Sequence, residues 1–139
     1  MLTKPITYTD YNEVERTEDF LFNLSKAELM EMELCTTGGL TEMIRKVVQT
    51  QDIPSIIKVF KDIILKAYGE KSPDGKTFIK IDENGRKLAD KFAQTEAYSV
   101  LFMELATDDV AAAAFINGII PKDLREANTA APTLVTANN

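Results

Sequence analysis

The chain of 139 residues contains no histidine, no tryptophan and one cysteine, Cys35. Without histidine, Ser-His-Asp and Cys-His catalytic arrangements and histidine-containing zinc sites are excluded. A lone cysteine cannot form an internal disulfide, and we interpret Cys35 as a small buried apolar residue rather than a nucleophile. The phosphate-loop pattern is also missing around Gly38 and Gly39. The sequence therefore predicts that the protein is not an enzyme and has no catalytic, cofactor or metal site.

Basic stripes and long apolar runs are scarce as well. The formal net charge is -6, from 22 acidic and 16 basic residues, so attraction to nucleic acid is not expected. No apolar run approaches the roughly 20 residues that span a bilayer. The N-terminal residues lack the apolar core of a signal peptide. We expect a cytosolic protein that binds neither membranes nor nucleic acid.

The N-terminal segment has the pattern of a β-hairpin. Ile6 and Tyr8 alternate with polar residues, and residues 10–13 are Asp-Tyr-Asn-Glu, which favour a turn. Phe20 and Phe22 continue the extended pattern beyond it. An isolated hairpin is only marginally stable in water, so its apolar face should pack on the elements that follow.

Helical patterns occupy most of the remaining chain. Ser25 and Glu28 form a capping box that begins a helix reaching about Leu34. We assign the apolar stripe of this helix to Ala27, Met30 and Leu34. The helix that starts after Asp52 has the most regular apolar face, which consists of Ile53, Ile56, Ile57, Phe60, Ile63, Ile64 and Ala67.

Further signals place the other helices and their ends. An apolar stripe runs from Leu40 to Val48. Residues 77–81 are expected to form a short extended stretch. The expected starts and stops elsewhere are Gly69 as a helix end, Asp82 and Thr95 as N-caps, and a last helix from Thr107 or Asp108 to about Asn117 with Gly118 as its stop. The Ala111–Ala114 run is interpreted as permitting close helix packing.

Together these signals predict a mainly α fold, a bundle of about five to six helices with an N-terminal β-hairpin. Residues 1–120 should form this single domain. Residues 121–139 are rich in alanine, threonine and asparagine and contain few large apolar side chains, so they are predicted to be a disordered tail.

Two of the predicted helices carry apolar residues on two sides. Leu29 and Met32 lie off the main stripe of the first helix, and Val100 and Met103 lie off that of the helix after Thr95. Two interpretations are open. Both helices are sandwiched inside the bundle, or these four residues contribute to a groove that binds a partner, a use that suits flexible methionine.

Several short sequence motifs together cover about residues 6–121: Tyr8–Asn12, Glu18–Phe20, Leu24–Glu28, Met30–Glu33, Gly38–Glu42, Tyr68–Gly75, Thr95–Ser99, Leu101–Ala106 and Ala112–Gly118. In their order along the chain, these motifs resemble the tail assembly chaperones of siphophages.

The resemblance implies a function that the residue patterns alone do not. Such proteins bind the aggregation-prone tape measure protein, keep it soluble in the host cytoplasm while the tail tube assembles, and are absent from the finished virion. Many exist as a short form, which this chain resembles, and as a longer frameshifted form that recruits tail tube protein. Self-association stays open. The alternatives are a minor structural tail or connector protein, or a small phage adaptor that binds a host factor.

Overall fold

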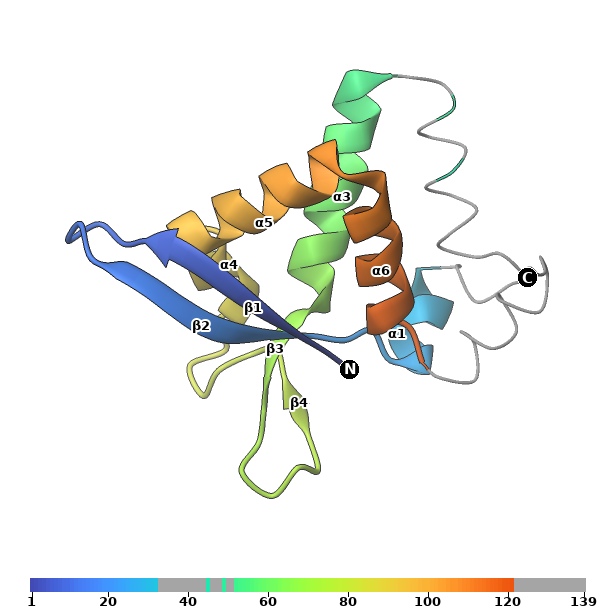
Figure 1. The fold of residues 1–139 in the computed structure, drawn as a ribbon. Helices are drawn as coiled ribbons and strands as arrows, with labels where there is room; N and C mark the ends of the chain where they lie inside the picture. Colours follow the sequence, from blue (N-terminus) through green and yellow to red (C-terminus); the bar gives the residue numbers. More distant parts are fainter. Residues whose placement is uncertain (33–44, 46–48, 50–51, 122–139) are drawn as a thin grey trace.

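The computed structural model describes residues 1–32, 45, 49 and 52–121 of the chain. The predicted Leu40–Val48 stripe, the interpretation of Cys35 and nearly all of the predicted tail lie outside the described residues. The described elements are β1 (Leu2–Thr9), β2 (Glu15–Phe22), α1 (Lys26–Glu31), α3 (Ile53–Ala67), β3 (Tyr68–Lys71), β4 (Phe78–Ile79), α4 (Leu88–Phe92), α5 (Glu96–Thr107) and α6 (Asp109–Ile119) (Figure 1).

The predicted N-terminal hairpin is confirmed. β1 and β2 pair antiparallel from Leu2 opposite Phe22 to Thr9 opposite Glu15. The Asp10 carboxylate closes the turn, because one of its oxygens accepts hydrogen bonds from the backbone N–H groups of Asn12 and Val14 at 2.8 and 3.0 Å. Burial alternates along β1, so one face of the hairpin packs inward while the other faces solvent.

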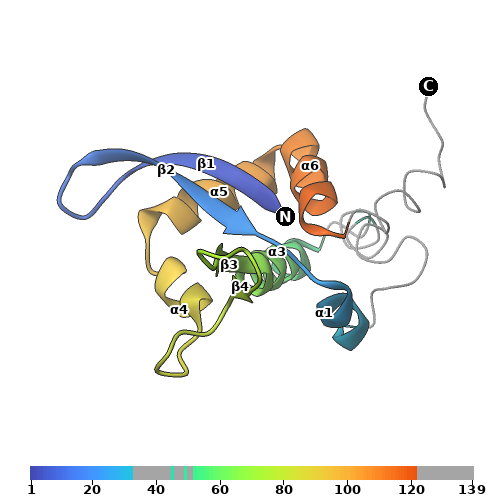
Figure 2. The same cartoon turned by 90° about the horizontal axis from the view of Figure 1, so that it is seen from below.

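The prediction of a mainly α bundle is wrong. The described part contains five helices and a four-stranded antiparallel sheet in the order β1-β2-β3-β4, with 49% helix and 23% strand, so the fold is mixed α/β. Helices α3, α5 and α6 lie on one side of the β1–β2 hairpin (Figures 1 and 2). β4 lies within the stretch expected to be extended, but β3 and its pairing with β4 were not predicted, because four and two residues are too few to show an alternating pattern.

Two glycines that were expected to end helices have a different role. Gly69 lies buried in β3, where an added Cβ would come within 2.6 Å of Phe78 Cε2 and 2.7 Å of the Ile79 carbonyl oxygen. Gly118 lies inside α6, and a Cβ there would be 2.8 Å from Leu2 Cδ1. Both glycines therefore permit close packing of strands on their neighbours rather than marking helix ends.

Capping was predicted with mixed success. The capping box of Ser25 and Glu28 is confirmed, and Thr95 accepts a hydrogen bond from the Tyr98 N–H at the start of α5. Asp82 does not cap a helix. Its carboxylate closes a turn by accepting from the N–H groups of residues 84 and 86, both at 2.9 Å, and α4 begins only at Leu88.

The core joins the sheet to the helices through aromatic rings. The Phe92 ring of α4 stacks on Tyr68 with a centroid distance of 4.3 Å and an interplanar angle of 6°. It also contacts Phe20 at 5.3 Å and Phe22 at 5.8 Å. Phe22 and Phe92 are both buried. The short helix α4 therefore serves to seal the sheet against the helical layer, and each aromatic pair adds about 0.5–1.5 kcal/mol beyond area burial.

Lys80 follows β4 and links three parts of the chain through hydrogen bonds. Its ammonium donates to the carbonyl oxygens of Asn23 at 2.8 Å and Lys66 at 2.7 Å, and to Glu28 Oε2 at 2.6 Å. Partial burial favours the neutral form of Glu28, but the hydrogen bonds from Lys80 and Ser25 and the Lys80 charge outweigh it, so the pKa of Glu28 is lowered. Burial also lowers the pKa of Lys80, and the Glu28 carboxylate offsets this only in part.

Candidate functional site

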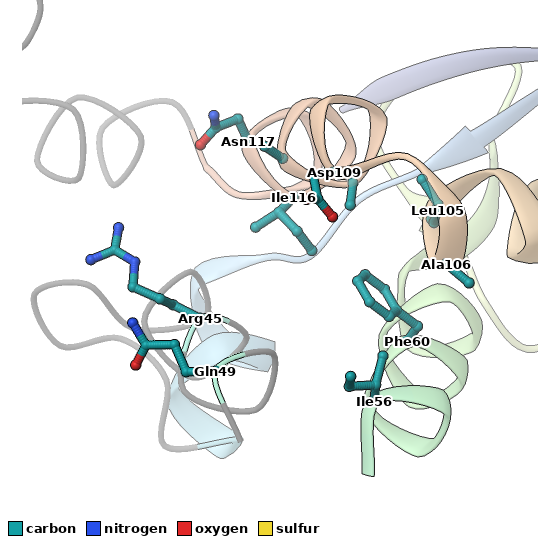
Figure 3. Close-up of a pocket in the computed structure, with 11 residues that line it drawn as sticks. Arg45, Gln49, Ile56, Phe60, Leu105, Ala106, Asp109, Ile116 and Asn117 are labelled. Carbon is teal, nitrogen blue, oxygen red and sulfur yellow. The ribbon is translucent and has the colours of Figure 1, made fainter. Parts of the chain in front are cut away.

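A groove of about 420 Å³ opens between α3 and the corner where α5 meets α6 (Figure 3). Ile116 on α6 and Phe60 on α3 point into it from opposite walls. Its described lining consists of Arg45, Gln49, Ile56, Phe60, Leu105, Ala106, Asp109, Ala112, Ala113, Ile116 and Asn117. The volume falls within the ~300–1,000 Å³ range of sites that enclose a ligand, and most of the lining is apolar.

The periodicity of α6 builds one wall. Residues 109, 112, 113, 116 and 117 are spaced i, i+3, i+4, i+7 and i+8, so they share one face of the helix. Asp108 fixes the start of this helix, because its Oδ1 accepts hydrogen bonds from the N–H groups of Val110 and Ala111 at 3.0 and 3.1 Å. The opposite wall comes from Ile56 and Phe60, which lie one turn apart on α3.

The groove combines a large apolar floor with small wall residues. Phe60, Leu105 and Ile116 are buried and belong to the hydrophobic core. Ala106 and Ala113 are exposed on the walls. Alanine leaves space that larger side chains would fill, so the groove can take bulk from an incoming molecule without disturbing the core.

The rim carries polar and charged side chains. Among the residues that the structure describes, the Asp109 carboxylate makes no hydrogen bond or ion pair, and its side chain points toward the groove (Figure 3). Arg45 lies across the groove and already interacts within the chain. Asp109 therefore gives the α6 side of the described rim a negative charge.

The structure separates the four residues that the sequence proposed as a partner surface. Leu29 is 1% exposed and belongs to the core, and Met32 is partly buried against it. Met30, which was placed on the buried stripe, is instead 67% exposed. With six residues α1 spans less than two turns, so periodicity could not determine which side faces inward.

Val100 and Met103 are exposed on α5, by 41% and 58% of their surfaces. Met103 precedes Ala106 of the groove wall by three positions, so the two residues are neighbours on the helix surface. Val100 precedes Met103 by the same spacing. These two residues therefore form an exposed apolar stretch that leads along α5 toward the groove.

The groove itself was missed by the sequence interpretation. Ala111–Ala114 was assigned to helix packing, which holds for Ala112, whereas Ala113 is exposed and lines the groove. The spacing from Asp109 to Asn117 was a usable signal on α6. Nothing in the sequence indicated that this face would lie across from Phe60, because that depends on how the sheet orients both helices.

A second hollow of about 270 Å³ lies beside the turn of the hairpin and is lined mainly by polar side chains. Tyr11 bridges its edge, because its hydroxyl donates to Glu96 Oε1 at 3.0 Å. Within the described ranges, no three acidic, histidine or cysteine residues gather as metal ligands would. No helix in those ranges has the length and apolar character needed to cross a membrane.

The chain matches a family model described as "Phage tail assembly chaperone" over residues 1–138. Searches of curated proteins and of solved structures find no match. That description is of a chaperone role in tail assembly. Because the family model spans nearly the whole sequence, the chain belongs to the phage tail assembly chaperone family.

Proposed function

We propose that this chaperone binds the tape measure protein of its phage and keeps it soluble during assembly of the tail tube. The observation that carries the proposal is the open apolar groove between α3 and the α5–α6 corner. A chaperone for an aggregation-prone chain needs accessible apolar surface, and a hollow of this size with an alanine wall provides it.

The overall charge is compatible with this role. A net charge of -6 keeps a small protein soluble even when it exposes an apolar site. The exposed residues Val100 and Met103 add apolar surface next to the groove, and methionine adapts to varied partners. Both residues were proposed as partner contacts from the sequence, and the proposal for them is retained. Leu29 is left out because it is buried in the core.

The proposed place and time of action follow from the client. The chaperone acts in the host cytoplasm, before the tail tube closes around the tape measure protein, and is then released. A longer frameshifted form would recruit tail tube protein to the same complex. Self-association of the chain is compatible with either form.

The test is co-expression of tagged chaperone with the tape measure protein of the same phage, followed by a pull-down. We expect soluble tape measure protein with the natural chain and strongly reduced recovery with Ala113→Arg, which places a long charged side chain in the groove. Ala114→Arg is the matched control, because Ala114 is exposed on the same helix and does not line the groove. Equal recovery with both variants would remove the groove from the proposal.

Two further results would overturn the proposed function. Mass spectrometry of purified virions should not detect the chain, and its presence in stoichiometric amount would indicate a minor structural or connector protein. A pull-down from infected cells should recover the tape measure protein. Recovery of a host protein and no tail protein would indicate an adaptor instead.

A further inference from the structure

We infer that the groove takes an amphipathic helix of the client, with large apolar side chains on the inserted face and a lysine or arginine opposite Asp109. The inference rests on the proposed function, because it specifies the kind of client segment that occupies this groove.

The walls favour a helical occupant. Every described lining residue lies in a helix, so the described parts of the walls offer no strand edge with which an extended segment could pair. An extended client would leave its own backbone N–H and C=O groups unpaired against an apolar floor, which costs free energy. A helix satisfies those groups internally and presents only side chains.

The length of the groove determines how much of a client helix can contact it. The groove-lining face of α6 runs from Asp109 to Asn117, which corresponds to about 12 Å or roughly two helical turns. A client helix packed along it would contact the groove with residues spaced i, i+3 or i+4, and i+7. Because Ala106, Ala112 and Ala113 supply little bulk, those client residues should be large, such as leucine, isoleucine, phenylalanine or methionine.

The charge of the rim indicates which side chains should lie beside the apolar face of the client helix. The carboxylate of Asp109 has no partner within the described ranges, and Asp108 lies beside it at the start of α6. Arg45, whose positive charge lies on the opposite side of the groove, leaves the α6 side of the rim negative. A cationic client residue would gain from this side of the rim, whereas an acidic one would be repelled.

The experiment uses the full chain with a photo-crosslinking amino acid at Ala113, co-expressed with full-length tape measure protein. We expect crosslinks from position 113 to a tape measure segment with apolar residues at helical spacing and a nearby lysine or arginine. The same amino acid at Ala114 should give fewer crosslinks, since that residue is exposed but does not line the groove.

A competition assay tests the charge. Natural and variant chains carrying different tags are co-expressed with limiting tape measure protein. Asp109→Lys should be recovered about tenfold less than the natural chain at low salt, and the deficit should shrink as salt increases. Asp90→Lys is the matched control, because Asp90 is also exposed in the first turn of a helix but lies outside the groove.

The outcomes separate the inference from the proposed function. If tape measure protein stays soluble but position 113 crosslinks to a second copy of the chain or to its own residues, the inference is wrong and the proposed function stands. The same holds if both charge reversals have equal effects or the crosslinked segment lacks helical periodicity. If no soluble tape measure protein is recovered with the natural chain, both fail.

Discussion

The two halves of α3 lie in different environments although they belong to one regular apolar face. In the C-terminal half Phe60, Ile63 and Ile64 are buried in the hydrophobic core. In the N-terminal half Ile53 and Ile57 are 60% and 46% exposed. The same pattern therefore serves as core at one end and as apolar surface near the groove at the other. Only the positions of neighbouring elements distinguish the two.

The largest expected effect on stability comes from substituting isoleucines in the two halves of α3. Ile64→Ala removes a fully buried side chain and should lower the free energy of unfolding by about 2–5 kcal/mol. Ile57→Ala, made two turns earlier on the same helix, should cost less than about 1 kcal/mol because the side chain is half exposed. Urea unfolding followed by circular dichroism measures both. Equal losses would mean that Ile57 is covered in solution and that the two halves do not differ.

A smaller effect is expected where Lys80 joins the buried end of α3 to the sheet. Lys80→Met keeps the aliphatic stem but removes hydrogen bonds to two backbone carbonyls and to Glu28, so we expect a loss of about 1–3 kcal/mol in unfolding free energy. Lys76→Met is the control, because Lys76 is exposed in the preceding loop. If the two variants unfold at the same urea concentration, the contacts of Lys80 contribute no net stability.

Much of the helical part of the fold could be predicted from the sequence. The capping box at Ser25, the N-cap at Thr95 and the face of α3 are local features, set by residues within a turn or two of one another. The hairpin was accessible for the same reason, because Asp10 closes its turn locally.

What could not be predicted depends on contacts between distant segments. β3 pairs with β2 across more than 40 residues, and nothing in its sequence Tyr-Gly-Glu-Lys suggests a strand. The inward side of α1 is decided by Leu29 meeting the core, not by its short periodicity. The groove likewise needs α3 and α6 to be set opposite one another by the sheet. Sequence patterns specified the longer helices and the hairpin, whereas the short strands and the surfaces depend on packing.

Part of the pH dependence of stability should come from Glu28, which accepts a hydrogen bond from Lys80 near the end of α3. Because the pKa of Glu28 is lowered on folding, its carboxylate stabilises the protein above its unfolded value of about 4.5, and this contribution is lost as pH falls through the folded pKa. In Lys80→Met, burial opposes ionisation with fewer compensating contacts, so the loss of stability on acidification should be smaller. Urea unfolding at pH 7 and at about pH 4 measures the difference. An unchanged pH dependence would show that Lys80 does not govern the ionisation of Glu28.

The smallest effect on stability is expected at the apolar surface that leads to the groove. The double variant Val100→Ser, Met103→Gln changes two exposed side chains of α5 and should alter the unfolding free energy by less than about 1 kcal/mol. If these residues extend the client surface, the recovery of soluble tape measure protein should nevertheless fall, because apolar contact area is lost. Ser99→Asn, at an exposed neighbouring position, should change neither quantity. A loss of several kcal/mol would assign Val100 and Met103 to the core, and unchanged recovery would restrict the client site to the groove.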